Sequence, residues 1–110
     1  MKYLFLFTPV LFVLLTAPLW SLPEGTEAVR GGGSFSTLGK EMTITAPDGS
    51  VFRHDRFDLS VDESVRFVQP SEQARVLNRI AGASPSQING RIEANGQVYL
   101  VNPAGGVFGE

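Results

Sequence analysis

The last third of the chain consists of short apolar runs separated by closely spaced Asn, Gly and Pro residues. Residues 91–94 alternate between charged and apolar side chains, Asn-Gly at 95–96 interrupts the pattern, and a second run at 97–101 stops at Asn-Pro at 102–103. A period of two predicts strands, and Asn-Gly and Asn-Pro predict tight turns. We therefore expect β structure without a helix in this region.

The same period recurs upstream. Residues 41–45 alternate and are followed by a Pro-Asp-Gly turn at 47–49, and the apolar pattern restarts at 51–52. Residues 57–61 alternate most clearly, and residues 65–68 place two apolar side chains on one face. Each of these segments is predicted to be a strand that ends at a turn.

Two segments are less regular. Residues 22–39 are rich in Gly and small polar residues, which predicts an irregular or extended entry to the fold. Residues 71–80 fit a helix that begins at Ser71 as well as a strand, because short apolar runs are ambiguous. Both interpretations of this second segment stay open.

Strand units follow one another at short intervals without alternating helices, which argues against a parallel sheet with helical crossovers. A small β-sandwich, a barrel and a β-solenoid all fit an all-β chain of this kind. The Asn-Gly pair suits a hairpin as well as a solenoid corner, and the sequence contains no exact internal repeat. Periodicity alone leaves the choice open.

The segment 1–21 has the architecture of a signal peptide, with one positive charge at Lys2 and an apolar stretch from Tyr3 to Leu15. This stretch is shorter than the roughly 20 residues that a membrane-spanning helix needs. We expect cleavage after Ser21, which would leave one domain at residues 22–110; an uncleaved anchor is the alternative. Membrane contact is expected only through this signal.

Composition narrows the function further. The formal net charge is -2 and basic residues are scattered singly, so no surface for nucleic acid is expected. The chain has no cysteine, which excludes disulfides and thiolate metal sites. A chain without disulfides can also cross an oxidising compartment without forming covalent loops that would obstruct threading through a pore.

Few residues suggest catalysis. His54 is interpreted as a solvated loop histidine, and a metal site formed by His54, Asp55 and Asp58 is not expected, because no further His or Cys is available. The acidic pair Asp62 and Glu63 is interpreted as exposed charge. We expect no catalytic residue, no metal and no cofactor.

Two other features have structural interpretations. The Gly triplet at 31–33 is not followed by a Lys-Ser/Thr pair or a helix, so it predicts a flexible entry rather than a phosphate cradle. Phe52, Phe57 and Phe67 are predicted to be core residues rather than a ligand platform.

An ordered set of short motifs resembles the amino-terminal two-partner secretion domain of filamentous haemagglutinin-like exoproteins. Each motif alone is unspecific, but their order and spacing match over most of residues 22–110. Leu22-Pro23 also resembles the start of such a mature exoprotein. The matching segments are VRFVQPS at 65–71, 77–80, Gly82, 85–88, 90–92, 94–96, 98–100 and 102–109.

The resemblance implies a right-handed parallel β-helix with an amino-terminal cap, here incomplete. It implies a non-enzymatic module that soluble periplasmic domains of an outer-membrane β-barrel transporter recognise. The exported protein would be secreted or held at the cell surface, as part of a large adhesin or haemagglutinin. The competing class is a fragment of a secreted β-helical enzyme that acts on polysaccharides, which would need converging carboxylate or basic groups.

The resemblance assigns the secretion motif Asn-Pro-Asn-Gly-Ile to residues 102–106. Asn102, Pro103 and Gly105 match, whereas Ala104 and Gly106 depart from the motif, which predicts a looser corner. The second family signature, Asn-Pro-Asn-Leu, is absent from the sequence. The residues that are expected to support the motif as turn residues are Asn78, Pro85, Asn95 and Gly96.

The chain ends at Glu110, short of a full secretion domain of this kind. An open solenoid end exposes unpaired backbone and core side chains. We therefore expect a truncated product, and we expect the isolated chain to be marginally stable.

Overall fold

A computed structural model describes residues 21–109, which contain strands and no helix. No helix that could span a membrane occurs in this part of the chain. The predicted signal peptide lies outside the described residues, except for Ser21. The strands are β2 (Glu27–Arg30), β3 (Ser34–Leu38), β4 (Glu41–Thr45), β5 (Ser50–His54), β6 (Ser64–Val68), β7 (Arg75–Ile80), β8 (Ser86–Ile88), β9 (Arg91–Ala94), β10 (Gln97–Val101) and β11 (Gly106–Phe108).

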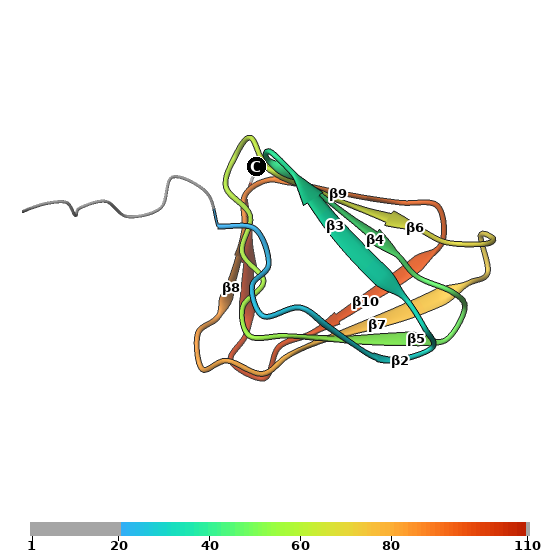
Figure 1. Cartoon of the computed structure of the whole chain (residues 1–110). Helices are drawn as coiled ribbons and strands as arrows, with labels where there is room; N and C mark the ends of the chain where they lie inside the picture. Colours follow the sequence, from blue (N-terminus) through green and yellow to red (C-terminus); the bar gives the residue numbers. More distant parts are fainter. Residues whose placement is uncertain (1–20, 110) are drawn as a thin grey trace, which may run out of the picture.

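The chain winds as a coil of three sides, which is seen end-on in Figure 1. One side is the sheet β3-β4-β6-β9 and the second is β2-β5-β7-β10. The third side pairs β8 with β11, and a bridge from Leu59 to Ile88 extends it. Strands from β4 onward pair in parallel with the strand one coil later. Of the alternatives left open by periodicity, this β-helix-like coil is the one adopted.

The length of one coil varies, which explains the absence of an exact repeat. On the first side, Glu41 pairs with Ser64, and Ser64 pairs with Arg91. More residues therefore separate the second pair along the chain than the first pair. On the third side, Ser86 pairs with Gly106, which is a shorter step than either of these. Parallel pairing fixes the strands, whereas the connecting corners can differ in length.

The first two strands run against the direction of the coil. β2 pairs antiparallel with β5, and β3 pairs antiparallel with β4. Gly31 and Gly32 connect them with φ angles of 94° and 74°, a conformation that residues with a side chain rarely adopt. The segment at 22–39 is thus largely extended rather than irregular, and two of its three consecutive glycines form a turn.

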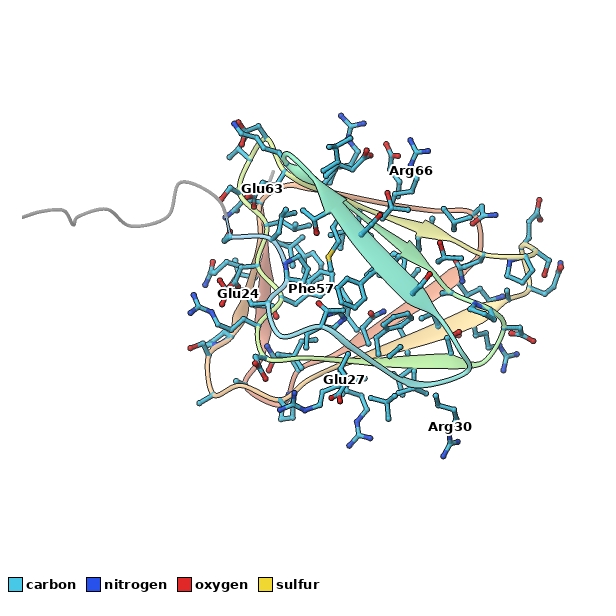
Figure 2. The ribbon with its side chains drawn as sticks, in the orientation of Figure 1. Glu24, Glu27, Arg30, Phe57, Glu63 and Arg66 are labelled. Atoms are coloured by element: carbon cyan, nitrogen blue, oxygen red, sulfur yellow. The ribbon has the colours of Figure 1, made fainter. Side chains whose placement is uncertain are left out.

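The interior of the coil is filled by side chains from all three sides. Phe52, Phe57 and Phe67 are each at most 1% exposed, which confirms their prediction as core residues. Figure 2 shows Phe57 inside the coil. Inward residues at matching register positions stack on one another: Met42 lies beside Val65 in the first sheet.

Two predictions about individual segments need correction. Residues 57–61 are not a strand, because this segment pairs only through the single bridge from Leu59 to Ile88, and Val61 is exposed. The helix alternative for residues 71–80 is wrong, since β7 occupies residues 75–80. In β7, pairing with β5 and β10 satisfies the backbone from both sides.

His54 and Glu63 are buried, so their interpretation as exposed residues is wrong. His54 is the last residue of β5 and lies on the same inward face as Phe52. The side chains of His54 and Phe52 are both fully buried. The imidazole stacks near the Phe52 ring and meets Phe57 edge-on, with ring centroids 5.0 Å apart in the second pair. Glu63 is 1% exposed, and its carboxylate accepts the N–H groups of Ser21 and Ser60.

Candidate functional site

Residues 102–105 form a tight turn at the end of β10. The Gly105 N–H donates to the Asn102 carbonyl at 2.9 Å, and the Ala104 N–H donates to Asn102 Oδ1 at 2.9 Å. Pro103 supplies the fixed φ that the second turn position favours, and Gly105 adopts a φ of 98°. The three predicted motif residues therefore act together in one turn.

The turn is also tied to the preceding coil. Asn102 Nδ2 donates to the Ser84 carbonyl at 3.1 Å and to Ser86 Oγ at 2.9 Å. The Ser86 N–H donates to the Gly105 carbonyl at 3.0 Å, which places β11 beside β8. Pro85 lies between the two serines, exposed and just before β8, so it neighbours the turn at residues 102–105.

The two departures from the family motif have different consequences. Ala104 contributes its backbone N–H to the turn, which needs no side-chain amide at this position. Gly106 faces inward beside Ser86, and an added Cβ would meet only ordinary contacts at 3.6 Å or more. A pocket of about 170 Å³ lies here, lined by Ile80, Ser86, Ile88, Leu100, Asn102, Gly105, Gly106 and Phe108. The missing apolar side chain thus leaves space unfilled.

A larger groove lies beside the turn, on the outer face of the sheet that contains β10. Its volume is about 470 Å³. Val101 and Pro103 connect it to the turn, while arginine side chains bring positive charge to a mostly apolar surface. The lining residues are Val29, Val51, Arg53, Arg79, Ile80, Ala81, Gly82, Val101 and Pro103.

Asn95 and Gly96 occupy a different corner, between β9 and β10. Asn95 Oδ1 accepts from the Gln69 N–H at 2.7 Å, and Asn95 Nδ2 donates to the Gln69 carbonyl at 2.6 Å. A Cβ at Gly96 would lie 2.7 Å from Gln69 side-chain atoms and 2.8 Å from the Ser71 carbonyl. One corner therefore stacks directly on the corner of the previous coil, as expected of turn residues.

Asn78 is not a turn residue, which corrects its predicted place. It lies in β7, fully buried, in register with Phe52 on one side and Leu100 on the other. The period of two that places Val76 and Ile80 inward also points Asn78 inward, and this signal could have revealed it. Its role is internal hydrogen bonding.

A short polar chain crosses the core at this position. Thr26 Oγ1 donates to His54 Nδ1 at 2.9 Å, and His54 Nε2 donates to Asn78 Oδ1 at 2.9 Å. Asn78 Nδ2 in turn donates to the Tyr99 carbonyl at 3.3 Å. Burial lowers the pKa of His54, and the hydrogen bond with Asn78 opposes that effect only partly. Neutral His54 thus satisfies both ring nitrogens as a structural group.

Across residues 21–109, no group of three or more His, Cys, Asp or Glu side chains is placed to hold a metal ion. Besides His54 and Asn78, two further buried polar residues were not predicted from the sequence, Gln69 and Glu63. Gln69 Nε2 donates to the carbonyls of Ala74 and Gln97, which joins two coils. Both residues lie next to a strand end, at positions where a polar side chain is ordinarily interpreted as part of a solvated turn.

Comparisons with known proteins agree with this geometry. Residues 22–110 match the family model described as the TPS secretion domain. A heme/hemopexin-binding protein of Haemophilus influenzae strain Rd is 41% identical over 86 residues, covering 76% of this chain and 9% of that protein. A second heme/hemopexin-binding protein of H. influenzae is 41% identical over 70 residues, covering 63% and 8%. The chain therefore spans about a tenth of the length of these relatives.

The crystal structure of the HMW1 secretion domain from H. influenzae superimposes with a TM-score of 0.77 at 28% identity, covering 80% of this chain and 24% of that one. It supports the β-helix-like fold. None of these similarities points to a polysaccharide-acting enzyme, because the family consists of secretion domains. Proteins with such a domain are exported through the periplasm and are secreted or displayed at the cell surface. The chain belongs to the family of TPS, or two-partner secretion, domains.

Proposed function

We propose that the turn at residues 102–105, together with the groove beside it, is the surface by which periplasmic domains of an outer-membrane β-barrel transporter recognise this chain. The observation that carries the proposal is the position of Pro103. It belongs both to the hydrogen-bonded turn and to the lining of the groove of about 470 Å³. A turn held by its own side chain presents this surface without a large ordering cost on binding.

The lining of the groove suits an extended or amphipathic partner segment. Val29 and Val101 are 56% and 49% exposed, which makes them available to an apolar partner. Arg79 at the same groove would favour an acidic group at its rim, whereas Arg53 already pairs with Asp55 at 3.0 Å. The combination of a small apolar centre and a charged border is common in protein recognition surfaces.

We infer further that the coil is right-handed and that β2 and β3 form its amino-terminal cap. Right-handed crossovers between parallel strands predominate because strands twist in one direction. The antiparallel pairing of β2 and β3 supports a cap, because these two strands lie outside the parallel stacking. A cap would protect the strand edges that the first coil otherwise leaves open.

Residues 1–21 are proposed to be a signal peptide that is removed, leaving the domain at 22–110. The family match beginning at residue 22 supports this boundary. We also propose that the domain belongs to a large exoprotein of the adhesin or haemagglutinin type. The lengths of the relatives support a long continuation, and the absence of cysteine from the sequence is compatible with unfolded transit.

A secretion assay tests the role of the turn. Cells that express the chain, its continuation and the matching transporter would carry Asn102→Ala, Pro103→Ala or, as a control, Asn89→Ala, an exposed Asn outside this turn. We expect the first two variants to reduce the amount of exported protein about tenfold, which corresponds to about 1.4 kcal/mol of lost recognition. Unchanged export of both variants, with the transporter shown to be active, would contradict the proposal.

A further inference from the structure

The carboxylate of Glu63 lies at the point where the chain enters the coil. Figure 2 shows Glu63 at this corner, close to the first described residues. The Ser21 N–H donates to both oxygens, at 3.0 Å to Oε1 and 2.8 Å to Oε2. The Ser60 N–H also donates to Oε1 at 2.8 Å, and Ser21 Oγ donates to it at 3.3 Å.

This carboxylate is 1% exposed, yet within residues 21–109 no Lys, Arg or His side chain forms an ion pair with it. Burying an ionised carboxylate is costly unless a positive partner or several hydrogen bonds compensate for the lost hydration. The donors that face Glu63 are all neutral while Ser21 is linked to the residue before it. The position now held by the Ser21 nitrogen lies almost equally far from both oxygens, and it suits an ammonium group, which has several hydrogens, better than an amide, which has one.

The start of the domain is held firmly next to this group. Leu22 packs against the core and Pro23 is buried. The Glu24 N–H donates to the Arg56 carbonyl at 3.0 Å, and the Asp55 N–H donates to the Glu24 carbonyl at 2.8 Å. These hydrogen bonds hold the backbone at Glu24, two residues after Leu22, so an amino terminus at Leu22 would lie within one residue of the present position of the Ser21 nitrogen and can move toward it.

The surroundings leave room for a terminus to settle. A pocket of about 340 Å³ is lined by Ser21, Leu22, Pro23, Glu24, Thr37 and Gly39. The turn that carries Glu63 is itself rigid, because the Glu63 N–H donates to the Ser60 carbonyl and the Glu63 carbonyl accepts from the Arg91 N–H. A Cβ at Gly90 would come within 2.4 Å of the Ser60 and Glu63 carbonyls, so this turn packs tightly on the next coil.

We propose that Glu63 is the binding site for the amino terminus that removal of the signal creates. Hydrolysis of the Ser21–Leu22 peptide bond by water leaves Ser21 with a terminal carboxylate, converts the Leu22 nitrogen from a neutral amide to an α-ammonium group and removes Ser21 from the Glu63 carboxylate. The new ammonium then moves into the place that the Ser21 nitrogen leaves and forms an ion pair with Glu63 in a largely buried setting. Removal of the signal thereby supplies the missing positive charge and stabilises the entrance of the coil. This inference depends on signal removal and not on recognition by the transporter.

The test uses the exported chain, whose first residue is identified by mass spectrometry. Potassium cyanate carbamylates the uncharged form of an α-amino group, so the rate of modification reports how firmly the ammonium is held. We expect the wild-type terminus to react about tenfold more slowly than that of Glu63→Gln, which corresponds to a pKa raised by about one unit. Glu72→Gln, a change at an exposed glutamate, serves as the matched control and should react like the wild type.

A second measurement does not depend on the variant folding. The α-ammonium of the wild-type chain, followed by ¹⁵N NMR during a pH titration, should show a pKa above the usual value of about 7.7–8.0 for a chain terminus. An ordinary pKa, or equal carbamylation rates in wild type and Glu63→Gln, would overturn the proposal. So would a mature terminus located before Ser21, because the Ser21 nitrogen would then remain a neutral amide.

Discussion

The second and third coils share one sequence pattern but differ in burial. β6, β7 and β8 bury their inward residues, and Phe67 is only 1% exposed. β9, β10 and β11 alternate in the same way, yet their inward residues are half-buried or exposed, and Phe108 is 70% exposed. The strands of the second coil have neighbours on both sides, whereas those of the third pair on one side only within residues 21–109. Alternation thus predicts which way a side chain faces, and stacking decides how deeply it is buried.

The largest effect on stability should come from truncating, one at a time, two side chains that are register partners in neighbouring coils. Val76 in β7 and Val98 in β10 are register partners, but Val76 is 1% exposed and Val98 is only half-buried. Val76→Ala should lower the free energy of unfolding by about 2 kcal/mol, and Val98→Ala by about 1 kcal/mol or less. Urea denaturation measures both values. Equal losses would mean that the two coils are equally well packed.

A second comparison concerns the two asparagine corners. Asn95 binds both the N–H and the carbonyl of Gln69, so Asn95→Ala should cost about 1–2 kcal/mol of folding free energy. Asn102→Ala should cost about 1 kcal/mol, because its contacts are more exposed. Thermal unfolding followed by circular dichroism would rank the two variants. A larger loss at Asn102 would reverse the order that we expect between the corners.

The stability of the inner coils should also depend on pH through His54. Burial lowers the folded-state pKa of His54 below the unfolded value of about 6.5, so between these two values the unfolded chain binds more protons. Stability is therefore complete above about pH 6.5 and should fall as the pH decreases through the lowered folded-state pKa of His54. Because the chain contains one histidine, His54→Gln should flatten this dependence in urea titrations at several pH values. An unchanged slope in the variant would assign the effect to other groups.

The smallest expected effect is a gain in stability from a substitution in the third coil. Gly106→Val would place an apolar side chain in the pocket of about 170 Å³, with no contact shorter than ordinary packing distance from its Cβ. We expect about 0.5–1 kcal/mol of added stability, since the variant buries apolar area and removes backbone freedom from the unfolded chain. Gly105→Ala is the matched control and should destabilise, because Gly105 has a φ of 98°. A lower free energy of unfolding in Gly106→Val than in the wild type would show that this corner cannot accept a side chain.

Local patterns predicted much of the strand content. The bounds expected for residues 41–45 and 97–101 are those of β4 and β10. Both segments alternate cleanly and end at residues that interrupt strands, so local sequence is sufficient to define them. The clear alternation at 57–61 was misleading, because Leu59 pairs through a single bridge with Ile88. Whether a segment finds a partner depends on a strand that is distant in the sequence, which local pattern does not report.

The turn of the candidate site was predictable, but its surroundings were not. Asn102, Pro103 and Gly105 have the residue types that such a turn requires. The burial of His54 was missed because Arg53 and Asp55 flank it, although the period of two places it on the same face as Phe52. The burial of Glu63 was missed because its partner, the Ser21 N–H, is distant in the sequence. Contacts of this kind follow from the winding of the coil.

Hydrogen exchange with and without the periplasmic domains of the matching transporter is the most direct test of recognition at the turn and groove. We predict slower exchange on binding at residues 101–105 and in the strands that border the groove, β2, β5, β7 and β10. Exchange in β4, β6 and β9, on another side of the coil, should stay unchanged. Protection confined to that other side, or no protection at all under conditions where binding is demonstrated, would contradict recognition at this surface.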